Sequence, residues 1–411
     1  MMLLQSKKAG TKLEAPGLLL LLFVCLLLVS CSDSSRPAVE RARRLGRSQG
    51  PVTVGIADCL PAERSQLARG IKLAAAEIRS RGILKRRLKL VWANDQSSVT
   101  RGLQIAQSFA DNPDICAVIG HCDSYVSVPA AIIYQYYGIL MLSPLSTSCR
   151  LTARNLSLVF ATIPNARAYG RALAEFCRNN DLKRILILQV DNEYGNSLAN
   201  SFERECQRQA VEVVDRAVFD PLSSRNMIRE KFRFWRQNHH LDALFVVAEM
   251  PAAARIVVDA RAVGIDTPIL GGDCFDDPDL IRKAGRAAEG VIVPSAFWLD
   301  ETQPQEKKFA KKFIECYGLK PDFVAAQGYS TMMVLAQALA KAEPVTSKMV
   351  SQALKREPKW RSLISFGFNP DGSVKDAKFF FKVVQNGKFV LFSEKDAIDA
   401  GRKPAPGVTR P

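Results

Sequence analysis

Residues 115–149 of this 411-residue chain combine a short apolar strand, a helix and a second apolar strand. The strands cover Ile115 to Gly120 and Ile139 to Leu142, and a glycine ends the helix between them. Strands joined through a helix run parallel. Parallel strands end at the same carboxyl edge of a sheet, which is where ligands bind in such folds. The turns containing Ser124 and Thr147 are therefore expected to share one cleft and to hold the carboxylate of a small ligand.

The same alternation of strand and helix patterns occupies the rest of the chain, which is long enough for two domains with separate cores. Apolar strand patterns occur at Val52–Asp58, Leu88–Asn94, Val159–Ile163, Arg184–Val190, Val211–Phe219, Ala243–Ala248 and Val291–Ala296. A hairpin is expected around Asn386-Gly387, and residues 396–411, which are rich in proline and glycine, are expected to form a loose tail. The pattern predicts an α/β protein.

The amino terminus has the pattern of an export signal. Three lysines precede an apolar run from Leu18 to Val29 that is too short to span a bilayer comfortably. The run ends in Leu-Val-Ser-Cys31, which resembles a bacterial lipobox. We therefore predict a lipoprotein signal peptide over 1–30, lipidation of Cys31, and a structureless basic tether over 31–50 beside an anionic membrane surface. The alternatives are an ordinary secretory signal and a short amino-terminal anchor.

The net charge of +16 does not indicate a nucleic-acid-binding protein. The basic residues are scattered along the chain, and stacking aromatic residues are not interleaved with them. No nucleic-acid partner is therefore expected.

Eight cysteines remain beyond Cys25 and Cys31, an even number that favours disulfides outside the cytoplasm. The preferred pairs are Cys122 with Cys149, which lie at neighbouring turns, and Cys177 with Cys206, which lie on consecutive helices. The alternative is buried free thiols. The sequence has no C-x-x-C motif and no close cluster of histidine and cysteine, so a metal site is not expected.

The order of several motifs resembles the substrate-binding proteins of branched-chain amino acid ABC transporters, the leucine/isoleucine/valine-binding type. The resemblance covers about Pro51 to Phe392. The matching segments are VTVGIAD, the Asp95-Gln96-Ser97 turn, AVIGHCDSYVSVPAA, GILMLSPLSTS, VFATIP, NEYGNSLA, PILGGD, AAEGVIV and FNPDG. Each segment is common alone, but their shared order is specific.

This resemblance implies a type I periplasmic binding protein, or Venus-flytrap, fold. Two Rossmann-like lobes with parallel sheets would be joined by three hinge crossovers and would close on a ligand between them. The implied lobes are 51–164 with 294–363 and 165–293 with 364–395. The hinges would lie at Pro164, at Pro294 and at 365–369.

The resemblance also implies a binding site for an α-amino acid. Ser124 and Thr147 match the hydroxyls that bind the ligand carboxylate. Asp273 matches an acidic position that pairs with the ammonium group, to which Leu145 would offer its carbonyl. Tyr194 matches an aromatic residue of the second lobe that closes over the ligand. The alternatives are helix caps for the two hydroxyls, a turn for Asp273 and a core position for Tyr194.

The chain departs from its relatives after the first strand, where residues 59–64 are short and lack an aromatic residue. Glu249, near another pocket position of the family, adds a charge. The ligand could therefore be a polar amino acid or an amide rather than leucine.

The expected function is that of a monomeric, lipid-anchored solute-binding protein in the periplasm or at the cell surface, which passes an amino acid to an ABC permease. A sensory lipoprotein with the same fold is the alternative. Nucleophile-elbow, phosphate-loop and dinucleotide motifs are missing from the sequence, so neither an enzyme nor a cofactor is expected.

Overall fold

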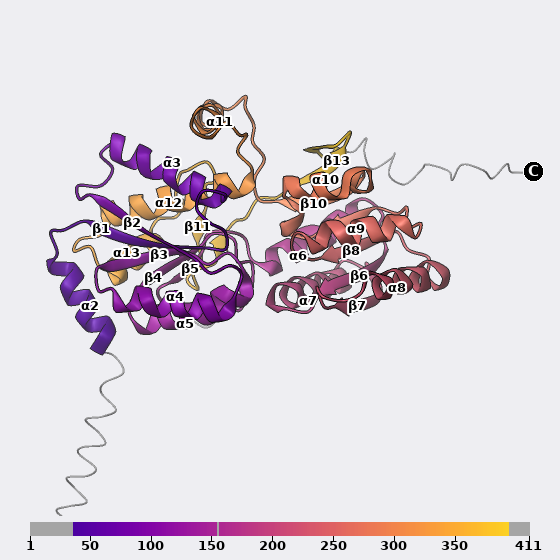
Figure 1. The fold of residues 1–411 in the computed structure, drawn as a ribbon, viewed down its shortest axis with the longest axis horizontal. Helices are drawn as coiled ribbons and strands as arrows, with labels where there is room; N and C mark the ends of the chain where they lie inside the picture. The colour runs from indigo at the N-terminus through magenta and orange to yellow at the C-terminus, as the bar shows by residue number, and fades with distance from the viewer. Residues whose placement is uncertain (1–35, 154–155, 394–411) are drawn as a thin grey trace, which may run out of the picture.

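The computed structural model describes residues 36–153 and 156–393, and these form two α/β lobes side by side (Figure 1). The predicted signal peptide, Cys31, and residues from 394 onward lie outside this part. Among the described residues, no helix is long and apolar enough to cross a membrane. The predicted architecture of two lobes with parallel sheets is confirmed.

Lobe one contains a five-stranded parallel sheet with the order β2-β1-β3-β4-β5. Its strands are β1 (Val52–Asp58), β2 (Leu88–Asn94), β3 (Ile115–Gly120), β4 (Leu140–Ser143) and β5 (Val159–Ala161). Its helices are α3 (Gln66–Ser80), α4 (Val99–Asp111), α5 (Ser124–Tyr136), α11 (Pro304–Tyr317), α12 (Phe323–Lys341) and α13 (Ser347–Arg356). Helices α3 and α12 lie on one side of the sheet, and α4 and α5 lie on the other (Figure 1). Because both faces are covered, strands such as β3 are apolar and buried along their whole length.

Lobe two contains a seven-stranded sheet with the order β14-β13-β10-β9-β8-β6-β7. Its strands are β6 (Arg184–Val190), β7 (Glu212–Phe219), β8 (Ala243–Val247), β9 (Ile269–Gly271), β10 (Val291–Ser295), β13 (Phe380–Gln385) and β14 (Lys388–Leu391). Its helices are α6 (Ala166–Asn179), α7 (Glu193–Arg208), α8 (Arg225–Asn238), α9 (Ala252–Ala262), α10 (Pro278–Ala284), and the short 3₁₀ turns η2 (Asp273–Phe275) and η3 (Gly285–Ala288). Only β13 runs opposite to the other strands of this sheet: it pairs antiparallel with β10 and, in a terminal hairpin, with β14.

The chain crosses between the lobes three times, after β5, after β10 and before β13. The third crossing lies later than residues 365–369, where the sequence placed it. A small hairpin of β11 (Gly367–Phe368) and β12 (Val374–Lys375) still belongs to lobe one. Phe368 packs edge-on against Phe160, and the backbone N–H of Ala161 donates to the carbonyl of Gly372 at 3.0 Å.

Residues 36–47, expected to belong to a structureless tether, instead form helix α2 (Arg36–Arg47), which docks on lobe one. The reason is Arg41, whose buried guanidinium donates to four backbone carbonyls. These carbonyls belong to Ala110, Asn112, Ile115 and Tyr137. Three of them lie at the carboxyl ends of α4 and α5, where the helix dipoles attract a cation.

Replacing Arg41 with alanine is expected to lower the free energy of unfolding by about 2–4 kcal/mol. The loss of the guanidinium leaves several buried carbonyls without donors, and each such group costs about 1–3 kcal/mol. Urea denaturation of the variant measures the change. Arg43→Ala, on an exposed face of the same helix, is the matched control, and equal midpoints for the two variants would contradict the docking role.

Candidate functional site

Two hydroxyl groups lie at the carboxyl edge of the lobe-one sheet, as predicted. Ser124 is the first residue of α5, and Thr147 follows β4; both are buried. Ser146 donates a hydrogen bond to the Ser124 hydroxyl at 3.2 Å. The Thr147 hydroxyl has no hydrogen-bond partner in the described part of the chain. Because buried polar groups are nearly always paired, this oxygen is available to a ligand.

The alternative role of Ser124, as a helix cap only, does not fit the geometry. Asp123 is the residue at the cap position of α5, and its side chain makes no capping hydrogen bond. Ser124 therefore lies in the first helical turn, where backbone N–H groups lack intrahelical partners and favour an anion. Leu145 is in the same lobe-one turn as Thr147 and is only partly buried against the core.

Lobe two contributes the predicted acidic residue. Asp273 begins the 3₁₀ turn after β9, is 8% exposed, and has one carboxylate oxygen without a partner among the described residues. Burial raises the pKa of Asp273 to about 7. A buried carboxylate whose pKa is raised in this way is strongly stabilised by an incoming ammonium group.

Tyr194 lies in the first turn of α7 and is buried within lobe two. Its hydroxyl accepts a hydrogen bond from the backbone N–H of Cys274 at 3.5 Å. A Cβ atom on Gly272 would lie 2.4 Å from that hydroxyl, so only glycine fits there. Tyr194 therefore supports the turn that carries Asp273, a role that the sequence did not suggest.

Glu249 follows β8 and accepts a hydrogen bond from the Asn192 amide at 2.9 Å. Asn192 also caps α7 through the backbone N–H of Gly195. Burial raises the pKa of Glu249, and the nearby charge of Asp123 acts in the same direction. The sequence indicated neither Asn192 nor Asp123 as a site residue, because both look like ordinary helix caps.

Contacts between the lobes lie beside Thr147. Ser148 and Arg150 of lobe one both bind the carboxylate of Glu193 at the start of α7, at 2.5 and 2.6 Å. The backbone N–H of Cys149 donates to the Ser197 hydroxyl at 3.2 Å. These contacts could not be found from sequence, because they join segments whose separation depends on the arrangement of the two lobes.

The predicted disulfides are wrong: all eight cysteines in the described part are free thiols. The register of β1 with β3 brings Cys122 next to Cys59 and Asp58, whereas Cys149 has left the sheet and contacts lobe two. Cys177 and Cys206 lie buried on the packed helices α6 and α7 without a bond. Asp58, Cys59 and Cys122 are close enough to hold a metal ion. The sequence did not indicate this grouping, because the two cysteines are far apart along the chain.

His121 has a structural role. It is fully buried, its Nδ1 lies 2.6 Å from the Asp95 carboxylate, and its Nε2 lies 3.0 Å from the Tyr134 hydroxyl. Both ring nitrogens are therefore occupied within lobe one.

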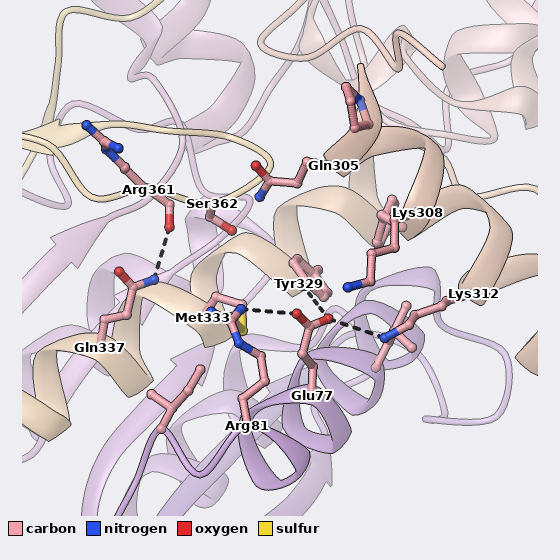
Figure 2. Close-up of a pocket in the computed structure, with 14 residues that line it drawn as sticks. Glu77, Arg81, Gln305, Lys308, Lys312, Tyr329, Met333, Gln337, Arg361 and Ser362 are labelled. Atoms are coloured by element: carbon pink, nitrogen blue, oxygen red, sulfur yellow. Dashed lines mark hydrogen bonds and ion pairs between the residues drawn. The ribbon is translucent and has the colours of Figure 1, made fainter. Parts of the chain in front are cut away.

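A cavity of about 640 Å³ lies elsewhere on lobe one, between α3, α11 and α12. At its centre Glu77 accepts a hydrogen bond from the Tyr329 hydroxyl at 2.9 Å and pairs with Arg81 and Lys312 (Figure 2). None of the predicted ligand-binding residues lines it. Its walls belong to lobe one alone, so relative movement of the lobes would not close it.

Comparison with known proteins decides the family. Residues 62–388 match the family described as periplasmic binding protein. The chain belongs to this family. Its relatives include the leucine-, isoleucine-, valine-, threonine-, and alanine-binding protein of Pseudomonas aeruginosa, which is 24% identical over 335 residues, covering 80% of this chain and 87% of the relative.

Solved structures of this family have the same fold. An ABC transporter substrate-binding protein from Desulfitobacterium hafniense in complex with Leu is 32% identical, with a TM-score of 0.73 over 83% of this chain and all of that one. A leucine binding protein from Thermotoga maritima is 23% identical, with a TM-score of 0.76 over 83% of this chain and 98% of that one. This periplasmic binding protein is thus homologous to amino-acid-binding proteins of ABC transporters, and its relatives are binding proteins rather than enzymes, as predicted.

Proposed function

We propose that this protein captures an α-amino acid between its lobes and delivers it to an ABC permease. The supporting observation is a pair of unsatisfied buried oxygens, one on each lobe: the Thr147 hydroxyl and one carboxylate oxygen of Asp273. With Ser124, the first would hold the ligand carboxylate, and the second would hold its ammonium. A ligand that bridges the lobes favours the closed state, because only that state makes both sets of contacts.

Thermal-shift measurements with single L-amino acids test the proposal. A bound ligand at about 100 times its Kd stabilises the folded state by about 2.7 kcal/mol, so the Tm should rise by a few degrees. The decarboxylated amine of the best ligand is the matched control and should have no effect. A flat response to every amino acid, or an equal response to the amine, would contradict the proposal.

We also propose that Cys31 carries a lipid that anchors the protein outside the cytoplasm. This part rests on the export signal and on the periplasmic family. The intact mass of the protein extracted from membranes should correspond to a chain that begins at Cys31 with attached acyl groups. Cleavage at another residue, or an unmodified cysteine, would contradict the anchor.

A further inference from the structure

Three side chains of the types that bind metal ions meet where β1 and β3 of lobe one end. They are Asp58, the last residue of β1, together with Cys59 and Cys122. A carboxylate oxygen of Asp58 and the two sulfur atoms all lie within 4.8 Å of one another. In the part of the chain that the structure describes, this is the one group of three or more histidine, cysteine or acidic residues with such spacing.

Strand pairing, rather than a sequence motif, builds this group. Strands β1 and β3 are parallel neighbours, and Ala57 lies opposite Gly120 in their register. Cys59 and Cys122 each follow one of these paired residues by two positions. Neighbouring strands lie about 4.8 Å apart, so side chains that follow the two strand ends at matching positions come into contact.

The separation of the sulfur and oxygen atoms fits a shared ion. The Cys122 sulfur lies 3.5 Å from Oδ1 of Asp58. In a tetrahedral zinc site, Zn–S distances of about 2.3 Å and Zn–O distances of about 2.0–2.2 Å place a sulfur and an oxygen ligand about 3.5 Å apart. This pair of side chains therefore already has the spacing that coordination of one ion requires.

The carboxylate of Asp58 also lacks a partner that its burial calls for. Asp58 is only 2% exposed, and its Oδ2 has no hydrogen-bond partner among the described residues. Its Oδ1 accepts from the backbone N–H of Leu60 at 3.2 Å and from the Cys122 thiol, and neither donor carries a positive charge. Because buried carboxylates and buried oxygens are nearly always paired, a cation is the partner that this site is missing.

The chemistry of the donors selects the kind of cation. Thiolate ligands favour soft or borderline ions such as Zn²⁺ and disfavour Mg²⁺ and Ca²⁺, which require oxygen ligands. Three protein ligands leave one tetrahedral position for water. Cys59 is only partly buried, so an ion can reach the group from solvent.

We propose that Asp58, Cys59 and Cys122 form a binding site for a thiophilic divalent cation such as Zn²⁺. Binding releases the protons of the two thiols, which become thiolate ligands. The bound ion joins the segment after β1 to the turn that leads into α5 (Ser124–Tyr136). This site is independent of the proposed function, because none of its three ligands is among the residues proposed to hold the amino acid.

Metal analysis of the purified, reduced protein without an affinity tag tests the proposal. After incubation with excess Zn²⁺ and removal of the unbound ion, we expect one zinc ion per chain. Co²⁺ in place of Zn²⁺ should produce a thiolate-to-cobalt charge-transfer band, which reports sulfur ligands directly. A protein that retains no zinc, or that binds cobalt without this band, would overturn the proposal. So would a disulfide between Cys59 and Cys122 in the protein isolated from its export compartment, detected by peptide mapping without reduction.

Variants of two ligands locate the ion. Cys59→Ser and Asp58→Asn should each weaken zinc binding at least tenfold, and circular dichroism checks that each variant is folded. The two variants are independent, so either one suffices if the other does not fold. Cys316→Ser, which replaces an exposed thiol far from the group in sequence, is the matched control and should bind zinc like the wild type. Wild-type zinc affinity in a folded Cys59→Ser or Asp58→Asn protein means that the ion lies elsewhere.

Discussion

Replacing the two cleft hydroxyls together, Ser124→Ala with Thr147→Val, is expected to weaken amino-acid binding at least about 100-fold. A hydrogen bond to a charged group contributes about 1.5–3 kcal/mol, so losing two costs about 3 kcal/mol or more. Valine keeps the volume of threonine, and the Thr147 hydroxyl has no hydrogen-bond partner to lose among the described residues. Thr147→Val should therefore cost the folded protein little stability, whereas Ser124→Ala removes the acceptor of the Ser146 hydroxyl and should cost about 1 kcal/mol.

Thr147→Ser is the matched control for this experiment, since it keeps the hydroxyl and should retain most of the affinity. Titration calorimetry with the best ligand measures each variant, and urea denaturation checks that the fold is intact. If the double variant binds within threefold of the wild type, these hydroxyls do not hold the carboxylate.

Asp273→Asn is expected to abolish ligand binding and yet to stabilise the empty protein at pH 8. The ammonium group loses its ionic partner, which lowers affinity. In the empty protein, however, the ionised carboxylate is destabilising, because burial raises its pKa from the ordinary 3.8 to about 7. Removing an ionisable group with such a shift should raise the free energy of unfolding by on the order of 2 kcal/mol at pH 8.

The direction of the pH dependence follows from proton binding. Between about pH 4 and pH 7 the native state holds a proton on Asp273 that the unfolded chain has already released. The contribution of this group to stability therefore falls as the pH rises through that window. Glu249, Asp276 and the buried hydroxyl of Tyr194 face the same carboxyl group and influence its titration.

Urea denaturation of the ligand-free wild type and variant at pH 5 and pH 8 measures the effect. The advantage of Asp273→Asn should be larger at pH 8 than at pH 5. Asp266→Asn, an exposed position in the same lobe, should behave like the wild type at both values. If Asp273→Asn is less stable than the wild type at pH 8, the ionised Asp273 carboxylate does not destabilise the empty protein.

The fold was predictable because its signals are local. Strands such as Ile115–Gly120 and Ala243–Val247 are buried apolar runs, and their spacing through helices dictates parallel pairing. Because parallel strands end at the same carboxyl edge of a sheet, the turns with Ser124 and Thr147 can be placed side by side from these segments alone.

The remaining features depend on long-range packing. In the sequence, Arg41 is one of several arginines in a basic segment. Only the folded chain brings backbone carbonyls near the ends of α4 and α5 around its guanidinium. Cys122 lies close to Cys59 rather than to Cys149, because β3 is the neighbour of β1 in the sheet. The contacts of Ser148 and Arg150 with Glu193 arise only because the two lobes face each other, so no local pattern could show them.

A crystal structure of the protein grown with its most stabilising amino acid tests the central claim most directly. We predict one ligand between the lobes, with its carboxylate within hydrogen-bond distance of Ser124 and Thr147 and its ammonium against Asp273. Ligand density in the cavity beside Glu77 (Figure 2), or density that contacts one lobe only, would contradict it.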